Sequence, residues 1–276
     1  MTRPLAIATV PYLNAWPLVY GLADRPDVRL RAEPPRALAP LLRQGEADAA
    51  LVPSIDYFRL TADRGERVRA HGPAAFVALP TAAIGSRGAI GSVRLFGYGD
   101  AAKLRRVRLD GDSRTSNVLA RILIRRTLGQ EPHYAVPADE RPGGRPPDAE
   151  VVIGDRALTP PPAGATWTLD LGEAWAELVH LPFVYAFWTA RADADLARLS
   201  AVLAEARDAG LAAVDDLAER AAERLGLEAA AARRYLTHQV RYAFGSPERK
   251  GLRAFYAMAV EEGLAPPDAR LRLAEA

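Results

Sequence analysis

The amino-acid sequence predicts an α/β protein of two lobes with a helical C-terminal tail. Its 276 residues are about twice the commonest domain size of roughly 100–150 residues, which favours two lobes over one. The first 55 residues alternate strand and helix patterns, typical of βαβ units and a mostly parallel sheet. Strand patterns return in the middle of the chain, whereas only helical spacing follows Ala194. We therefore expect a ligand cleft between the lobes, at the carboxyl ends of strands.

The N-terminal residues hold three short apolar runs of strand length, each followed by a helical pattern. The predicted strands are 5–10, 28–32 and 47–52. The predicted helices are 15–22, about 38–45 and 55–60. Asn14 is suited to cap the first helix, with Pro17 tolerated in its first turn, whereas Pro40 is expected to make the second helix irregular.

The middle of the chain changes to short strands separated by Gly- and Pro-rich turns. The predicted strands are 76–79, 83–86, 93–98, 107–110 and 150–154. A long amphipathic helix is expected after the segment GDSRTSN, and an exposed loop over 136–149. The aromatic run Phe183–Trp188 is predicted to be a buried strand that links the lobes, and Trp175 is expected to pack in the core.

The C-terminal tail is predicted to be helical throughout, because its apolar residues recur at helical spacing. Its first part predicts two helices broken at Gly210. Ser246 and Pro247 suit the N-cap and the first position of a final helix. The core-facing stripe of that helix is Leu252, Phe255, Tyr256, Ala259 and Val260.

Composition is that of an ordinary globular protein, with 49% hydrophobic and 25% charged residues. The formal net charge is only +2, from 36 basic and 34 acidic side chains, so no strong field attracts nucleic acid or an anionic membrane. The chain has no cysteine, which excludes disulfides, thiolate metal sites and cysteine nucleophiles. Lys103 and Lys250 are the only lysines, so anions must be bound by arginine, hydroxyl or backbone N–H groups.

The N-terminal apolar run is shorter than a secretory signal or a membrane span requires. We therefore expect a cytoplasmic protein that binds neither membrane nor nucleic acid. The four histidines are scattered without an HxH or HExxH pattern, so we expect no metal and no other cofactor. The sequence also contains no glycine-rich phosphate loop and no GxSxG nucleophile elbow.

Polar side chains follow the predicted strands, at the ends where such a protein binds its ligand. They are Tyr12 and Asn14, Ser54, Ser86 and Arg87, the SRTSN segment from Ser113 to Asn117, and Asp155. SRTSN is the best candidate for an anion site, because helix-start N–H groups and the helix dipole add to its guanidinium and hydroxyls. Each position also suits plain helix capping, and the GSRG segment suits a hairpin turn. The residues alone thus predict a cleft for a small anionic ligand, without separating an enzyme from a binding protein.

Six segments together resemble the chorismate dehydratases of the futalosine route to menaquinone. In chain order they are VPYLNAWPLVYGL, RQGEADAALVPSIDYF, IGSRGAIGSVRLF, VRLDGDSRTSNVLARILI, VVIGDRAL and LDLGEAWAELVHLPFVYAFWTAR. The resemblance runs from about Ile7 to Arg191 without large gaps, whereas the tail fits the family only in kind. Pro40 and the 136–149 loop depart from the family pattern, and neither touches a candidate site residue.

The resemblance implies a two-lobe type II periplasmic-binding-protein-like fold, with mixed sheets, flanking helices and a helical tail, used by a cytoplasmic enzyme. Lobe I would comprise residues 1–84 plus 184–276 and lobe II residues 85–183, with hinge crossings near Ile84 and Val184. The implied reaction is the dehydration of chorismate to 3-(1-carboxyvinyloxy)benzoate by a hydro-lyase without a cofactor. A homodimer is compatible with the sequence.

The resemblance also implies roles for the candidate residues. Asn14 and Ser86 match polar positions of the family cleft and are predicted to be the catalytic residues. Asn14 would bind the 4-hydroxyl or a carboxylate, and Ser86 would relay a proton or donate to the leaving hydroxyl. The predicted substrate-binding residues are Tyr12, Ser54, Arg87, Ser113, Thr115, Ser116 and Asp155.

Thr115 and Ser116 would hold one carboxylate at the helix start, and Ser54 and Arg87 are weaker candidates for the other. Asp155 is a candidate general base, and the alternative base is the substrate's own enolpyruvyl carboxylate. Two other functions stay open. One is a non-catalytic binding protein or sensor for a small dicarboxylate, and the other is a sister enzyme of the same pathway.

Overall fold

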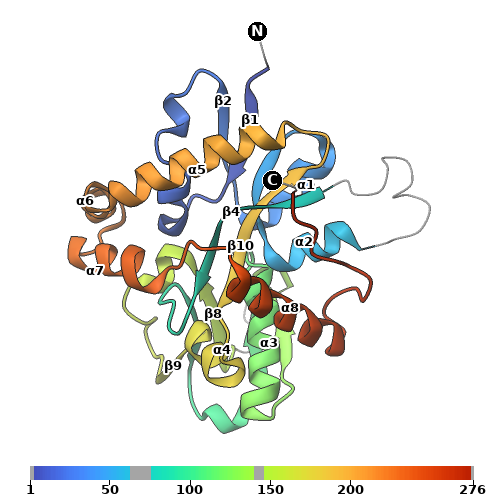
Figure 1. The fold of residues 1–276 in the computed structure, drawn as a ribbon. Coiled ribbons are helices and arrows are strands. Elements are labelled where there is room, and N and C mark those ends of the chain that lie inside the picture. Colours follow the sequence, from blue (N-terminus) through green and yellow to red (C-terminus); the bar gives the residue numbers. More distant parts are fainter. Residues whose placement is uncertain (1–2, 63–75, 140–145, 275–276) are drawn as a thin grey trace.

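The computed structural model describes residues 3–62, 76–139 and 146–274. These residues form two five-stranded sheets flanked by helices, together with a helical tail (Figure 1). We call the part built on the first sheet lobe I and the part built on the second sheet lobe II. In Figure 1 lobe I is the upper part of the molecule and lobe II the lower part. The predicted α/β architecture with mixed sheets is confirmed.

The sheet of lobe I has the strand order β2-β1-β3-β10-β4. Its strands are β1 (Leu5–Thr9), β2 (Val28–Ala32), β3 (Ala49–Pro53), β4 (Phe76–Ser86) and β10 (Phe183–Arg191). β1 pairs in parallel with β2 and β3, whereas β10 pairs antiparallel with both β3 and β4. The strands of the N-terminal βαβ pattern are thus parallel, as predicted. Since β10 returns from lobe II, it runs against its neighbours and makes the sheet mixed.

The sheet of lobe II repeats this arrangement, in the order β7-β6-β8-β5-β9. Its strands are β5 (Val93–Gly97), β6 (Arg106–Arg108), β7 (His133–Ala135), β8 (Ala149–Ile153) and β9 (Trp167–Asp170). β6 pairs in parallel with β7 and β8, whereas β5 is antiparallel to β8 and β9. The parallel strands β1 and β3 of lobe I, and β6 and β8 of lobe II, thus lead into segments that the sequence marks as candidate ligand sites.

Helices cover the sheets and make up the tail (Figure 1). Those beside the sheets are α1 (Pro35–Gln44), α2 (Ser54–Thr61), α3 (Thr115–Leu128) and α4 (Leu171–Val179). Those of the tail are α5 (Leu196–Ala212), α6 (Val214–Leu225), α7 (Ala229–Arg234), the π turn η8 (Tyr235–Gln239) and α8 (Ser246–Glu261). The short 3₁₀ helices are η1 (Leu13–Val19), η2 (Leu22–Asp24), η5 (Ala101–Lys103), η6 (Pro137–Asp139) and η7 (Gly154–Leu158). Within the described ranges, no helix is long and apolar enough to cross a membrane.

The first predicted helix differs in type and in its cap. It is the 3₁₀ helix η1, and Asn14 lies inside it, whereas Tyr12 is the N-cap and makes no side-chain capping bond. Pro17 lacks an N–H group for regular α-helical bonding, which favours the tighter turn. The predicted strands 76–79 and 83–86 form one continuous strand, β4. Strand β10 pairs with both parts of it, and the register of the pairing shifts between them.

The tail differs from its prediction at two positions. Gly210 is buried inside α5, and the break between α5 and α6 comes at Ala213. A Cβ atom at Gly210 would overlap the carbonyl oxygen of Pro17, so glycine here allows close packing on η1. The N-cap of α8 is Gly245, one residue before the predicted cap Ser246. The N–H group of Gly245 donates to the Glu248 carboxylate at 2.9 Å.

Two sequence features lie wholly or partly outside the described residues. They are His71 and the stretch 140–145 of the predicted 136–149 loop. The described part of that loop contains η6, and β8 begins at its last residue.

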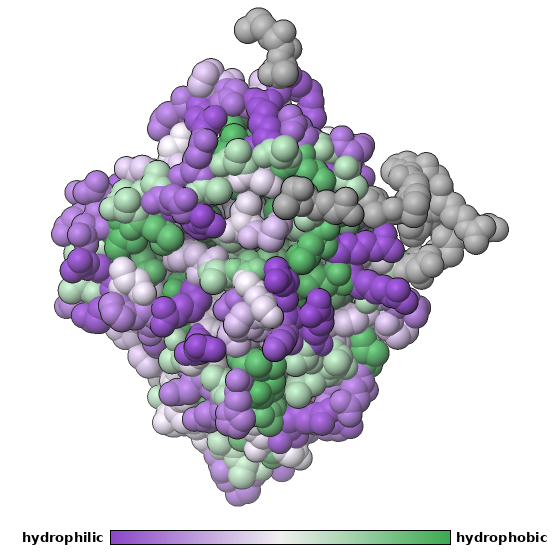
Figure 2. All heavy atoms as spheres, viewed as in Figure 1, coloured by the Kyte–Doolittle hydropathy of each residue, from purple (hydrophilic) through white to green (hydrophobic). Residues whose placement is uncertain are grey.

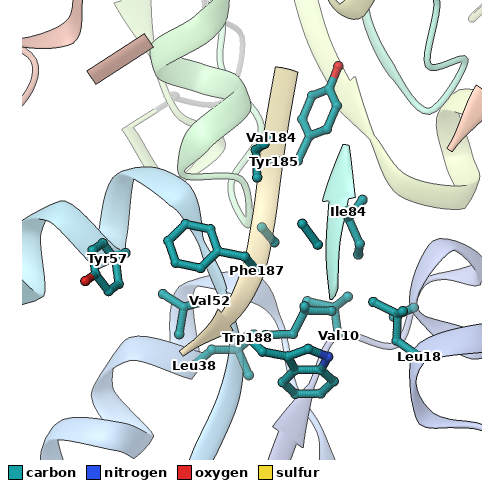
Figure 3. Packing of buried hydrophobic residues seen from close by; sticks show 14 of the residues in the cluster. Val10, Leu18, Leu38, Val52, Tyr57, Ile84, Val184, Tyr185, Phe187 and Trp188 are labelled. Atoms are coloured by element: carbon teal, nitrogen blue, oxygen red, sulfur yellow. The ribbon is translucent and has the colours of Figure 1, made fainter. Parts of the chain in front are cut away.

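The hydrophobic core is one cluster that continues from lobe I into lobe II. β10 is buried over almost its whole length, which confirms the prediction for Phe183–Trp188. Trp175 packs edge-on against Phe183 and Phe255, which confirms its expected place in the core. In Figure 3 the Tyr185 hydroxyl points away from Trp188, toward the far end of β10. Figure 2 shows a mostly hydrophilic outer face with smaller hydrophobic areas between.

The chain passes between the lobes along β4 and β10, which stay paired at the crossing. Gly85 pairs with Val184, and it also exchanges two backbone hydrogen bonds of 2.9 and 2.8 Å with Arg241 of the tail. A Cβ atom at Gly85 would lie 2.6 Å from the Phe183 carbonyl oxygen, so glycine is required between these segments. The predicted lobe boundaries, 1–84 plus 184–276 and 85–183, fall beside this crossing and stay a prediction.

Candidate functional site

A cavity lies between the lobes, at the carboxyl ends of their parallel strands. Most of its wall is apolar. The polar lining residues are Tyr12, Asn14, Ser92, Ser113, Arg114, Thr115, Ser116 and Tyr185. Because these residues come from both lobes, a bound ligand would contact both.

The cavity brings together a part of the predicted site. The predicted residues that line it are Tyr12, Asn14, Ser113, Thr115 and Ser116. The predicted residues that do not line it are Ser54, Ser86, Arg87 and Asp155, all within the described part of the chain. The start of α3 and the 3₁₀ helix η1 therefore both contribute polar groups to the wall of this cavity.

The turn before α3 is held in place by its own side chains. The Asp110 carboxylate accepts from the N–H groups of Asp112 at 2.9 Å and Ser113 at 3.1 Å. The Asn117 amide donates to the carbonyl oxygens of Asp110 and Ser113, both at 2.8 Å. These bonds fix the first turn of α3 at the cavity wall, where helix N–H groups and the helix dipole favour an anion.

Hydrogen bonds between backbone and side chain cross the cleft and join the lobes. The Ile55 N–H of α2 donates to Thr115 Oγ1 at 3.2 Å. The Leu13 N–H of η1 donates to Asp155 Oδ1 at 3.0 Å. The lobes are therefore closed against each other in this structure, with residues predicted to bind substrate at both contacts.

Two arginines add ion pairs across the cleft. Arg36 of α1 pairs with Asp112 at 2.8 Å, and Arg114 pairs with Asp56 at 3.4 Å. The arginines are about half exposed, so each pair contributes little to stability. Arg114 also lines the cavity, which places a guanidinium beside the anion-favouring start of α3.

We expect Thr115→Val to lower the free energy of unfolding by about 1 kcal/mol, because valine keeps the side-chain shape but leaves the Ile55 N–H without its acceptor. Thr115→Ser keeps the hydroxyl and should retain most of the stability. Urea unfolding of the three proteins measures the difference. Equal midpoints for valine and wild type would mean that this hydrogen bond does not join the lobes.

Asn14 presents an acceptor at the cavity wall. Its Oδ1 is buried and has no hydrogen-bond partner among the described residues. Buried polar atoms normally have a partner, so an orphaned acceptor beside a cavity suits a ligand donor. Beside it, the Tyr12 ring lies against Gly154, where a Cβ would approach to 2.8 Å. Burial, with Asp110 and Asp112 nearby, raises the pKa of Tyr12 to about 12, so its hydroxyl stays protonated.

The remaining predicted residues lie behind or beside the wall. Ser86 is buried, with its Oγ 3.5 Å from the hydroxyl of Tyr185, which itself lines the cavity. Ser54 donates to the carbonyl oxygen of Val184 at 2.7 Å, next to the crossing. Arg87 is exposed on the turn after β4. The structure thus brings Ser86 close to the cavity and leaves Ser54 and Arg87 outside it.

Ser92 and Tyr185 line the cavity but were not predicted from the sequence. Ser92 precedes a strand and Tyr185 lies within a buried one, so the local pattern marks neither as a ligand residue. In the described residues, no group of three or more histidine, aspartate or glutamate side chains is placed to hold a metal ion.

Asp170 is a third residue that sequence reasoning missed. Its carboxylate accepts from the N–H groups of Ile90 at 3.0 Å and Gly91 at 2.6 Å, and it caps α4 through Gly172 at 2.9 Å. Asp170 therefore fixes the turn that follows Ser86 against α4. An aspartate directly before an apolar helix is an N-cap signature, and this signal in LDLGEAW could have found it.

Comparison with known proteins agrees with this geometry. The chain matches the family model described as menaquinone biosynthesis over residues 5–261. A curated relative, the chorismate dehydratase of Thermus thermophilus, is 31% identical over 274 residues, which cover 92% of this chain and 94% of the relative. Both findings confirm the resemblance seen in the six sequence segments.

Solved structures at low sequence identity share the fold. A protein of Archaeoglobus fulgidus superposes with a TM-score of 0.70 at 18% identity, over 95% of this chain and 98% of its own. The periplasmic aliphatic sulphonate binding protein of Escherichia coli gives a TM-score of 0.59 at 18% identity, over 100% and 95%. The predicted periplasmic-binding-protein-like fold is thus confirmed. By its family model and its curated relative, this chain belongs to the menaquinone biosynthesis family.

Proposed function

We propose that this protein is a chorismate dehydratase, a hydro-lyase that converts chorismate to 3-(1-carboxyvinyloxy)benzoate on the futalosine route to menaquinone. The name of the Thermus thermophilus relative and the family support this activity. The structural observation that carries the proposal is the cavity between the lobes, whose wall is mostly apolar and includes the first residues of α3. Apolar walls suit a carbon ring, and a helix start suits a carboxylate.

The reaction removes the 4-hydroxyl and the C3 proton, and the ring becomes aromatic. Aromatisation drives the reaction, so the protein mainly orients the ring and stabilises developing charge. The C3 proton is acidified by conjugation through the diene to the ring carboxylate. Thr115 and Ser116 hold this carboxylate at the start of α3, with Arg114 beside them, and stabilise charge as it builds there.

Asn14 and Ser86 are assigned to the reacting side of the ring, Asn14 in direct contact and Ser86 through its neighbour Tyr185. No histidine or glutamate lines the cavity in the described part of the chain. We therefore assign proton removal from C3 to the substrate's own enolpyruvyl carboxylate, with Asp155 as the alternative base. We assign that second carboxylate to Tyr12 rather than to Ser54 or Arg87, because Tyr12 lines the cavity and the other two do not.

The deciding experiment mixes the purified protein with chorismate, follows the loss of diene absorbance and identifies the product by mass. We expect conversion to the dehydrated aromatic product without added metal or cofactor. Binding without conversion would instead indicate a binding protein or sensor. No reaction with chorismate, together with turnover of a later intermediate, would indicate a sister enzyme.

The biosynthetic family supports a cytoplasmic place of action, which we propose as well. Fractionation of cells that produce the tagged full-length chain tests it, and activity in the membrane or secreted fraction would contradict it. Light scattering on the same preparation measures whether the enzyme is a homodimer, which the sequence leaves open.

We expect Asp155→Asn to raise the melting temperature at pH 7 by about 2 °C. Burial raises the pKa of Asp155, so its ionised form destabilises the folded state once the pH exceeds that pKa. Asparagine keeps an acceptor for the Leu13 N–H without the buried charge. The difference between the two proteins should shrink as the pH falls toward the ordinary aspartate value of 3.8, where both proteins are neutral at this position.

The same variant separates the two candidate bases. If the substrate carboxylate takes the proton, Asp155→Asn should retain turnover within about tenfold of wild type. A loss of several hundredfold, with disappearance of the acid limb of the pH–rate profile, would make Asp155 the general base. Scanning calorimetry and initial rates on one preparation provide both measurements.

A further inference from the structure

Helix α2 of lobe I contacts two successive residues at the start of α3 in lobe II. The Ile55 N–H group donates to Thr115 Oγ1 at 3.2 Å, and the Asp56 carboxylate pairs with the Arg114 guanidinium. Arg114 and Thr115 line the cavity, whereas Ile55 and Asp56 do not. Lobe I thus supplies partners to two cavity residues of lobe II without lining the cavity at these positions.

Asp56 contacts Arg114 at one edge of the guanidinium. Arg114 Nε lies 3.5 Å from Oδ1 and 3.4 Å from Oδ2 of Asp56, almost equally far from both oxygens. Among the described residues, no hydrogen bond engages the two terminal nitrogens of Arg114, and an arginine carries most of its five N–H donors there. The contact with Asp56 therefore orients the guanidinium and leaves its terminal N–H groups to a ligand.

Asp56 is itself held in place. Its side chain is 7% exposed, and Arg59 Nη1 donates to its Oδ1 at 3.0 Å. Arg59 also donates to the carbonyl oxygen of Leu264 at 3.4 Å. One carboxylate is thus shared by two guanidinium groups, which leaves an excess of one positive charge in this cluster. Arg114 can therefore bind a second anion while it keeps its contact with Asp56.

Thr115 adds a second donor beside this guanidinium. Its Oγ1 accepts from the Ile55 N–H group, and within the described ranges its own hydrogen has no acceptor, so the O–H is left to donate. A carboxylate offers two acceptor oxygens and no hydrogen, and charge-assisted bonds from arginine to such a group are among the strongest. The donors that α2 supports at the start of α3 therefore suit a carboxylate.

We propose that Asp56 is a positioning residue that holds the Arg114 guanidinium at the cavity wall, so that Arg114 and Thr115 together bind the ring carboxylate of the substrate. This inference rests on the proposed dehydratase function and adds a residue of lobe I to it. Because Asp56 and Arg114 belong to different lobes, their contact exists only while the lobes are closed. Recognition of the carboxylate is thereby coupled to closure of the lobes.

Asp56→Asn tests the proposal, because it removes the charge and keeps the shape of the side chain. The loss of a nearby negative charge would by itself strengthen the binding of an anionic ligand, whereas the loss of the guanidinium's position weakens it. We expect kcat/KM for chorismate to fall about tenfold, the equivalent of one charge-assisted hydrogen bond. An unchanged or higher kcat/KM would overturn the proposal.

Arg36→Gln is the matched control. Arg36 pairs with Asp112 across the same cleft at 2.8 Å, and neither residue lines the cavity. The loss of this pair should leave kcat/KM within about twofold of wild type, because an exposed ion pair contributes little. Calorimetry of both variants separates loss of activity from loss of folding.

Arg114→Lys provides a second variant should Asp56→Asn fail to fold. Arg114 is about half exposed, so its replacement is tolerated by the fold. Lysine keeps the positive charge but has no Nε–H group for Asp56 and no planar fork for a carboxylate. We expect the same loss of about tenfold in kcat/KM. Wild-type kcat/KM for Arg114→Lys would show that charge alone suffices and would overturn the proposal.

Two ligands give a readout that a merely structural role would not move. 3-(1-carboxyvinyloxy)benzoate and 2-phenoxyacrylate differ only in the ring carboxylate, and titration calorimetry measures the Kd of each. Asp56→Asn and Arg114→Lys should raise the Kd of the benzoate about tenfold and that of 2-phenoxyacrylate less than about twofold. Equal changes for both ligands, or tighter binding of the benzoate, would overturn the proposal.

The proposed function and this inference can fail separately. If the wild-type protein binds chorismate without converting it, the dehydratase proposal fails, while the comparison of the two ligands still decides the role of Asp56. If the wild-type protein converts chorismate and both variants keep its affinity for the benzoate, the function stands and this inference fails. No binding of the benzoate by the wild-type protein would also overturn this carboxylate site.

Discussion

We expect Asn14→Ala to lower kcat/KM for chorismate by about 10²–10³-fold, the usual cost of removing one preorganised polar group at a reacting centre. Alanine removes Oδ1 of Asn14, a residue that lines the cavity. This oxygen is buried and has no hydrogen-bond partner among the described residues. Initial rates from the loss of diene absorbance measure the effect. The melting temperature should change little, because the lost Oδ1 makes no bond within the protein part that the structure describes.

Thr189→Val is the control for that experiment. Thr189 Oγ1 is also buried without a partner in the described residues, but Thr189 does not line the cavity. Its replacement should leave kcat/KM within about twofold of wild type, because it removes an unsatisfied buried group away from the ligand. If Asn14→Ala behaved like Thr189→Val, the assignment of Asn14 to the reaction would be wrong.

Ser86→Ala should have a smaller effect than Asn14→Ala, about tenfold in kcat. Its hydroxyl reaches the cavity only through Tyr185, at 3.5 Å. A larger loss for Ser86→Ala would place it in direct contact with the substrate after the lobes adjust. Near-full turnover in both variants would contradict the whole catalytic assignment.

Gly210→Ala is expected to destabilise the protein by about 3 kcal/mol, the upper end of the usual cost of overpacking. The added Cβ would overlap the Pro17 carbonyl oxygen and lie 2.6 Å from Pro17 Cα, and a backbone cannot yield as a side chain can. For a chain of this size the melting temperature should fall by roughly 10 °C. Activity should fall as well, because Pro17 belongs to η1, which carries Asn14.

Ala209→Gly on the exposed face of α5 provides the comparison. It should cost about 1 kcal/mol through helix propensity alone and leave kcat/KM unchanged. Thermal unfolding of both variants separates propensity from packing. A Gly210→Ala protein as stable as wild type would show that α5 does not approach η1 as closely as the structure has it.

Most strands and helices were predictable because each carries its own periodicity and punctuation, whereas β7, β9 and α4 were not predicted. The pairing of the strands was less predictable. The N-terminal pattern alone suggests a mostly parallel sheet, whereas β10, from far along the chain, inserts between β3 and β4 and pairs antiparallel with both. Gly210 shows a second limit. A glycine in a helical pattern suggests a break, and only the position of Pro17 against it shows that it serves close packing.

The candidate site was predictable where residues that line the cavity follow directly after strands. Asn14 and Thr115 follow parallel strands, and the cavity brings them together. Asp56 lies in the predicted helix 55–60, where the local pattern does not single it out, so its approach to Arg114 depends on tertiary packing. Ser54 and Arg87 also follow strands, but neither lines the cavity. Ser54 donates to the carbonyl oxygen of Val184, and Arg87 is exposed to solvent.

The position of β10 between β3 and β4 has a consequence for biosynthesis. A ribosome releases every strand of lobe II, and α4 up to Val179, before it releases β10 from Phe183 onward. Lobe I therefore lacks an inner strand while the whole of lobe II is already available to fold. We therefore expect lobe II to fold before lobe I, the reverse of the usual order in which the N-terminal unit folds first. Until β10 arrives, β3 and β4 present exposed strand edges, so the nascent chain is most prone to aggregation just before translation reaches this strand.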